Sequence, residues 1–134
     1  MPHVSKSVLN KKIETEIKKT FCMALSGLGQ EEEMNEFLTS ILSPTENLML
    51  SKRLAIVLLL SEDVPSSKIA AILHVTRETV ARVELLYQLK PEGYKTALKK
   101  INNQETIYKL KHALLKLAGY TVRAAGGRVK PEIF

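Results

Sequence analysis

Cysteine and tryptophan are nearly absent from this chain of 134 residues, which has one Cys and no Trp. The lone thiol of Cys22 excludes a disulfide framework and a cysteine zinc site. Three Phe and four Tyr without any Trp argue against a base-stacking platform for single-stranded nucleic acid. The longest apolar run, Leu54 to Leu60, is far shorter than the ~20 residues of a membrane-spanning helix. We therefore expect a cytoplasmic protein without a membrane segment or a metal site.

The charge of the chain is +6, and it is unevenly distributed. Residues 1–89 carry ten basic and eleven acidic side chains, a net charge of −1, whereas residues 90–134 carry ten basic and three acidic ones, a net charge of +7. A basic excess favours a polyanionic partner but does not choose among the polyanions. We expect the basic excess of residues 90–134 to add sequence-independent, salt-sensitive affinity for phosphates.

Apolar residues recur every three or four positions through each long segment, which predicts helices. Ser43, Pro44 and Glu46 form a capping box with proline at the first helical position. No segment alternates with a period of two, so we expect an all-α fold of about six or seven helices. The helices are expected near 9–27, 31–42, 44–60, 66–73, 76–89, 92–101 and 104–118. The run Leu54–Leu60 is apolar on all sides, which suggests that a partner subunit covers it.

The pattern over residues 64–89 is typical of a helix-turn-helix, in which the second helix enters the major groove of duplex DNA. Ile69, Ala70 and Leu73 are expected to face inward from the first helix, Val75 to fill the turn, and Val80 and Val83 to face inward from the second. An ordinary helical hairpin would share this apolar spacing. The turn, the helix cap, the small residue and the exposed polar side chains all agree with a helix-turn-helix, and this agreement favours DNA binding.

The polar residues of this motif are the candidate DNA contacts. Ser66, Ser67 and Lys68 begin the first helix, where hydroxyl, ammonium and backbone donors suit phosphate. The second helix would present five further residues to the DNA, namely Thr76, Arg77, Glu78, Thr79 and Arg82. His74 occupies the turn position that is usually glycine. We interpret His74 as a turn residue rather than a metal ligand, because His3 and His112 are distant in the sequence.

Three stretches resemble the bacterial Trp repressor family, especially the related branch whose members have no established tryptophan response. They are Leu42-Ser43-Pro44-Thr45-Glu46, Lys52-Arg53-Leu54-Ala55-Ile56-Val57 and Thr79-Val80-Ala81-Arg82-Val83. The resemblance covers roughly residues 30–102. It implies an intertwined all-α homodimer whose N-terminal and central helices form a shared core.

In that family two arginines sandwich the indole of the corepressor, and the resemblance places Arg53 and Arg82 at their positions. The family has glycine directly after the second arginine and serine four residues after it, whereas this chain has Val83 and Leu86. A branched side chain beside the indole and an apolar one in place of a polar contact disfavour tryptophan binding. We therefore expect no cofactor. Arg53 is then a structural residue or faces phosphate, and Arg82 contacts DNA. The alternative is a ligand pocket at Arg53 and Arg82.

These observations together predict a homodimeric, sequence-specific regulator, in the first instance a repressor, that binds a palindromic duplex site on the nucleoid. An amino-acid-gated repressor, a promoter-recognition or replication-initiator module and a helical adaptor that binds no DNA are the alternatives. No catalytic triad, glycine-rich phosphate loop or carboxylate pair suggests an enzyme. We expect residues 1–103 to form the dimerisation and DNA-binding domain, and residues 104–134 a basic helix and tail.

Overall fold

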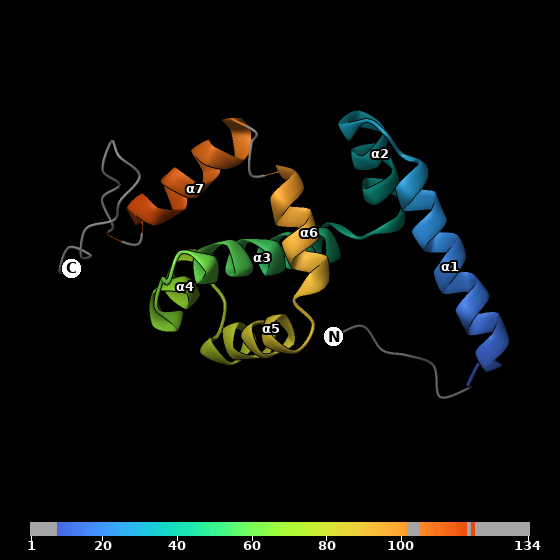
Figure 1. The fold of residues 1–134 in the computed structure, drawn as a ribbon, viewed down its shortest axis with the longest axis horizontal. Coiled ribbons are helices and arrows are strands. Elements are labelled where there is room, and N and C mark those ends of the chain that lie inside the picture. Colours follow the sequence, from blue (N-terminus) through green and yellow to red (C-terminus); the bar gives the residue numbers. More distant parts are fainter. Residues whose placement is uncertain (1–7, 102–104, 118, 120–134) are drawn as a thin grey trace. The chain divides into compact units, whose positions relative to one another are not determined.

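The computed structural model describes residues 8–101, 105–117 and 119, and within these ranges it contains seven helices and no strand (Figure 1). The helices are α1 (Lys11–Gly27), α2 (Glu31–Ile41), α3 (Pro44–Ser61), α4 (Ser66–Leu73), α5 (Arg77–Leu89), α6 (Glu92–Ile101) and α7 (Glu105–Leu117). The all-α prediction is confirmed, and the bounds agree because caps and breakers mark most helix ends locally. The predicted tail beyond residue 119 lies outside the described residues.

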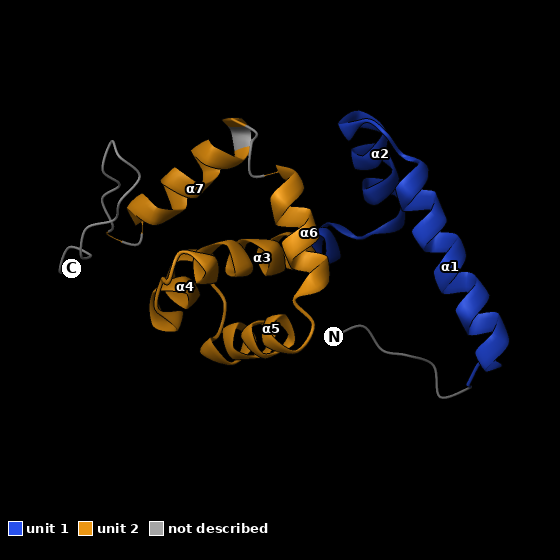
Figure 2. Cartoon of the chain, viewed as in Figure 1, with its two compact units in different colours: residues 1–47 blue, residues 48–134 orange. Residues whose placement is uncertain are grey.

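The chain divides into two compact units, residues 1–47 and residues 48–134 (Figure 2). In the first unit, Asn10 caps α1 by accepting from the Lys12 amide, and the rings of Phe21 and Phe37 lie 6.2 Å apart between α1 and α2. No described residue of this unit is buried. Ile41, at the end of α2, is 50% exposed. The apolar stripe of α1 is likewise largely exposed, with Ile13, Ile17 and Phe21 at 52%, 53% and 42%.

The capping box predicted at the start of α3 is present. The Glu46 amide donates to Ser43 Oγ at 3.1 Å, and the Ser43 amide donates to Glu46 Oε1 at 3.0 Å. The backbone hydrogen bond from Ser43, followed by that with its hydroxyl, lowers the pKa of Glu46 because both favour the carboxylate. The start of α3 is therefore fixed by four neighbouring residues, independently of tertiary packing.

The core of the second unit centres on α3, whose residues Ile56 to Leu59 are buried. Three of them, Ile56, Val57 and Leu59, pack in one cluster with side chains from α4, α5 and α7 and with Val64 of the α3–α4 turn. The apolar run that suggested a partner subunit is thus covered largely by the chain's own helices. The exposed apolar residues of α3 are instead Leu48, Met49 and Leu50, in its first half.

α6 and α7 complete the second unit. Tyr94 of α6 packs against Tyr87 of α5, with the ring centroids 5.8 Å apart. Leu114 and Leu115 of α7 are 8% and 3% exposed and belong to the same core as α4 and α5. By its packing, α7 is part of the unit that contains the helix-turn-helix. The functional division at residue 103 stays a prediction.

Candidate DNA-binding site

α4 and α5 pack against each other beside α3 and form the predicted helix-turn-helix (Figure 1). His74, at the end of α4, has φ 53° and ψ 50°, the left-handed conformation that glycine adopts most easily. The Val75 amide donates to the Ala70 carbonyl at 3.1 Å across this turn. A left-handed residue turns the chain sharply enough to bring α5 back against α4, so His74 performs the role that glycine usually has.

The inward faces of α4 and α5 agree with the sequence pattern. Ile69 and Val80 are fully buried, Ala70 is buried, and Val83 is 4% exposed. Leu73 and Val75 are half-buried and pack against the same core. Since this apolar face holds α5 from one side, the opposite side of α5 is left to solvent.

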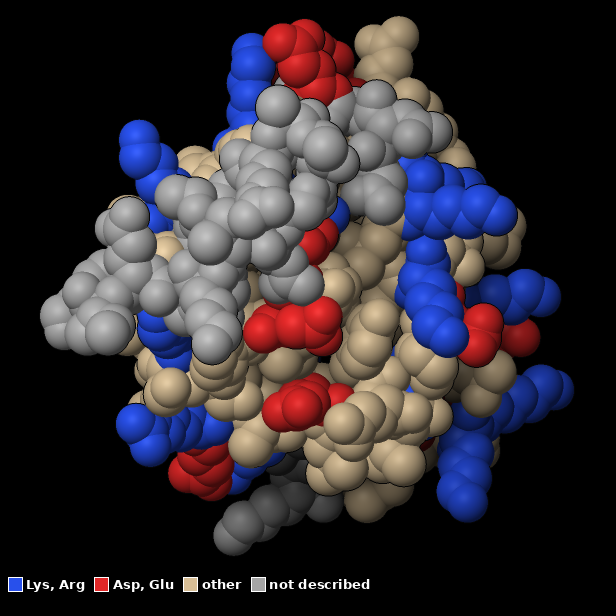
Figure 3. All heavy atoms as spheres, turned by 60° about the vertical axis from the view of Figure 1, so that its left-hand side comes forward, with Lys and Arg blue, Asp and Glu red and all other residues tan. Residues whose placement is uncertain are grey.

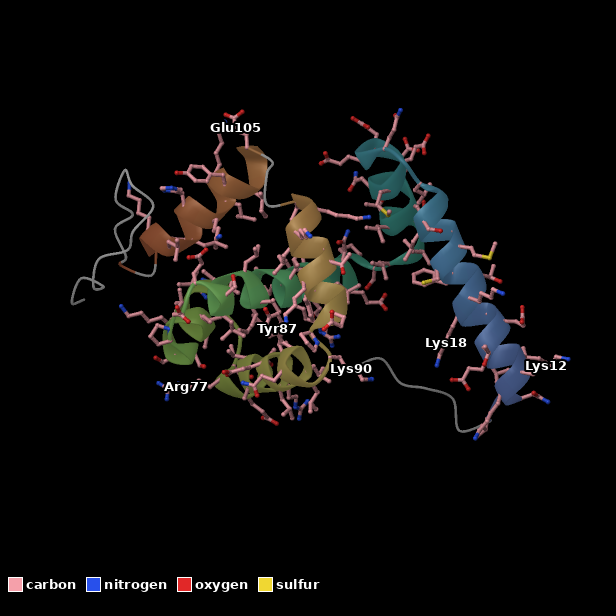
Figure 4. The ribbon with its side chains drawn as sticks, viewed as in Figure 1. Lys12, Lys18, Arg77, Tyr87, Lys90 and Glu105 are labelled. Carbon is pink, nitrogen blue, oxygen red and sulfur yellow. The ribbon has the colours of Figure 1, made fainter. Side chains whose placement is uncertain are left out.

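The first two turns of α5 present the polar side chains. Thr76 caps the helix, because its Oγ1 accepts from the Thr79 amide at 3.1 Å, and the two threonine hydroxyls lie 2.9 Å apart. Arg77, in the next position, is exposed and points away from the unit in Figure 4. Glu78, Thr79 and Arg82 are exposed too. The five residues predicted to face DNA from α5 therefore share one accessible end of one helix.

An ion pair organises part of this surface. Arg82 Nη2 donates to Glu78 Oε1 at 2.7 Å, one turn earlier on α5. The Arg82 and Glu78 side chains are 63% and 74% exposed, so the pair is weakened by solvent screening. The interaction that holds the two groups side by side is therefore weak.

Residues at the start of α4 form the second part of the predicted interface. Ser67 is exposed, whereas Ser66 and Lys68 are half-buried. The Lys68 amide donates to the Pro65 carbonyl at 3.0 Å. That backbone donor is consequently occupied, and the contact to phosphate predicted for Lys68 would have to come from its ammonium group.

The alternative corepressor site has little support in this geometry. Arg53 is half-buried on α3, while the guanidinium of Arg82 is engaged by Glu78 on the surface of α5. Val83 lies in the core, and Leu86 is 51% exposed. An apolar groove does exist in the first unit, where Ile13, Ile17, Phe21 and Phe37 are among its lining residues, but neither arginine lines it.

Sequence reasoning missed one contact between α3 and the turn. Lys52 Nζ donates to the His74 carbonyl at 3.5 Å, across 22 positions of sequence. The contact joins α3 to the point where the chain turns into α5. A local pattern carries no signal for such a pair, since only the packing of α4 on α3 brings the two residues together.

The surface charge is mixed. On the face shown in Figure 3, basic and acidic side chains alternate rather than forming a continuous area of one sign. The exposed lysines of α6 are Lys95, Lys99 and Lys100. On this face the charge alone does not mark a candidate DNA-binding surface, and the exposed face of α5 is the more informative feature.

The described residues contain no group of three or more His, Cys, Asp or Glu side chains that could hold a metal ion. His74 is exposed, and His3 lies outside the described residues. Among the helices of the described ranges, none has the length and apolar character that crossing a bilayer requires.

Comparison with known proteins gives one match. The family model described as Trp repressor protein matches residues 16–113, which is 98 of the 134 residues. The matched region begins within α1 and ends within α7, so it contains the whole helix-turn-helix. Neither the search of curated proteins nor that of solved structures found a match.

Proposed function

Because the chain belongs to the Trp repressor family of helix-turn-helix DNA-binding regulators, we propose that it binds a specific duplex site as a homodimer and represses transcription there. The observation that carries this proposal is the exposed polar end of α5, presented by a helix whose other face is buried. The N-terminal residues of a recognition helix are those that reach base edges in the major groove. We expect the protein to act on the nucleoid, in the cytoplasm.

The proposed roles follow from the donors and acceptors on this surface. Arg77 and Arg82 are suited to bidentate contacts with guanine or to phosphate, and Glu78 to accepting from the amino group of cytosine. Thr76 and Thr79 offer hydroxyls to either bases or phosphates. Ser66, Ser67 and Lys68 would contact phosphate and set the register of the motif on the DNA.

The exposed apolar residues of the first unit support the homodimer. Ile13, Ile17 and Phe21 form a stripe on α1 and are 42–53% exposed. A contiguous apolar surface of this kind is typical of an interaction site rather than of a solvated helix. A second copy of the chain would cover it and would place two recognition helices roughly 34 Å apart, one turn of DNA, so the site should be an approximate palindrome.

We propose that DNA binding needs no tryptophan. The Val83 side chain fills core space, Leu86 lacks a polar group, and Arg82 already has a carboxylate partner. An indole sandwiched by Arg53 and Arg82 would therefore not gain the polar contacts that amino-acid recognition requires.

The test is selection of bound fragments from random duplex DNA by the full chain, followed by titration at fixed salt. Arg77→Ala and Arg82→Ala should each weaken specific binding by about tenfold or more and relax preference at particular base pairs. Lys90→Ala is the matched control, because it removes one exposed cation from the other end of α5. Unchanged affinity in both arginine variants would refute the assignment of the recognition surface. Absence of duplex binding at moderate salt would favour the helical adaptor, and a monomer by sedimentation would refute the homodimer.

A further inference from the structure

α7 contacts the part of the molecule that joins α3 to the helix-turn-helix. Its residues Leu114 and Leu115 lie in the same core cluster as Ile69 of α4 and Val80 of α5. The chain passes from α3 to α4 through residues 62–65 alone. The position of α4 and α5 relative to α3 therefore depends on this short connection and on the core beneath it.

An ion pair attaches α7 to that connection. Lys111 Nζ of α7 pairs with Glu62 Oε1, directly after the last residue of α3, and the side chains are only 26% and 22% exposed. By contrast, Lys109 and Glu105 form a pair along α7 whose side chains are 73% and 81% exposed. A pair shielded from water and salt is coupled more strongly than an exposed one. Lys111 is thus placed to hold α7 against the connection.

The connection itself is tightly folded at Glu62. The Asp63 amide donates to the Leu60 carbonyl at 3.0 Å, and the Val64 amide donates to the Leu59 carbonyl at 3.1 Å. Asp63 has a left-handed φ of 58°, and Val64 is 3% exposed. A non-glycine residue in this conformation persists when the surrounding structure holds it there. The contacts of α7 with Glu62 and the core supply part of that structure.

We propose that α7 is an intramolecular brace that positions the helix-turn-helix for DNA, and that Lys111 and Glu62 are its positioning residues. This inference rests on the proposed DNA binding. The apparent affinity of a site falls in proportion to the fraction of molecules that hold the competent arrangement. Docked α7 raises that fraction by restricting how α4 and α5 move against α3, without touching the DNA itself.

The experiment uses the full chain with single charge reversals on α7. Lys111→Glu places a carboxylate against Glu62, whereas Lys109→Glu makes the same change in net charge at an exposed position of the same helix. The double variant Lys111→Glu with Glu62→Lys restores an ion pair of reversed polarity. Specific DNA affinity and amide hydrogen exchange of α4 and α5 are measured for each variant at one salt concentration.

If repulsion undocks α7 in about nine molecules of ten, Lys111→Glu should weaken specific binding about tenfold beyond Lys109→Glu and speed exchange in α4 and α5. The double variant should recover most of both losses. Equal behaviour of Lys111→Glu and Lys109→Glu, or failure of the double variant to recover, would overturn the brace. If the wild-type chain binds no duplex, the proposed function fails, and the exchange rates alone decide about the brace.

Discussion

Replacing Val83 by glycine introduces the residue that the Trp repressor family has at this position, and the structure predicts that stability falls sharply. Val83 is 4% exposed within the core of the second unit. Its three side-chain carbons contribute about 0.8 kcal/mol each when buried, roughly 2.4 kcal/mol in all. Glycine inside a helix costs about 0.5 kcal/mol more than valine, which is itself a weaker helix former than alanine. The expected loss in the free energy of unfolding is therefore about 3 kcal/mol.

Two comparison variants separate these contributions. Val83→Ala introduces no glycine into the helix and should lose about 2 kcal/mol, mainly through the burial that is lost. Ala81→Gly, at an exposed position of the same helix, should lose only about 1 kcal/mol through backbone entropy. Urea unfolding of the three variants measures the losses directly. If Val83→Gly costs no more than Ala81→Gly, Val83 is not in the core and the orientation of α5 is wrong.

The same proteins test the absence of tryptophan gating. Val83→Gly removes the branched residue that follows Arg82 in the sequence but supplies no polar group in place of Leu86. Neither the wild-type chain nor Val83→Gly should therefore gain thermal stability in millimolar tryptophan. A concentration-dependent rise in melting temperature of the wild type would refute the reasoning, because a ligand that binds the folded state must stabilise it.

Three other predictions concern the turn, the cap and the lysines of α6. His74→Gly should raise the free energy of unfolding, measured in urea, by about 0.5 kcal/mol, because glycine adopts the left-handed backbone conformation at φ 53° without strain. Ala71→Gly, in the middle of α4, should lower the free energy of unfolding. The pKa of Glu46 is lowered in the folded chain, so its contribution is present at neutral pH and lost as the pH falls through that lowered value. The stability difference between the wild type and Glu46→Gln should accordingly shrink from pH 7 to about pH 3, and a constant difference would contradict the cap as its source. On α6, the exposed lysines Lys95, Lys99 and Lys100 are replaced together by glutamine. The slope of log affinity against log salt should become flatter by up to about three, while the sequence preference stays the same. An unchanged slope would exclude α6 from phosphate contact.

The phosphate affinity expected of the basic residues 90–134 is better tested by substitutions than by truncation. Truncation after Asn103 would remove Leu114 and Leu115 from the core together with the positive charge. A loss of affinity would then have two causes, unfolding of the second unit and loss of phosphate contacts. Substitutions of exposed lysines separate the two, because they change the charge and leave the core intact.

The features that depend on neighbouring residues could be predicted from the sequence. The helix bounds, the Ser43–Glu46 box, the Thr76 cap and the turn at His74 each involve residues within a few positions of one another. Their physical causes are the helical period, orphan amides at helix starts and the conformational limits of single residues. The helix-turn-helix could be predicted for the same reason, because the residues of its buried face and of its exposed face lie in one continuous stretch of sequence.

Which surfaces those helices cover depends on tertiary packing and could not be predicted from local patterns. Leu54–Leu60 suggested a partner subunit, yet the chain's own helices bury its central residues, while the apolar stripe of α1 remains exposed. Glu62 and Lys111 are 49 positions apart in the sequence, and no local pattern links them. Packing depends on contacts between residues that are distant in the sequence. Which residues come into contact follows from the burial of apolar surface over the whole unit, and no single segment contains that information.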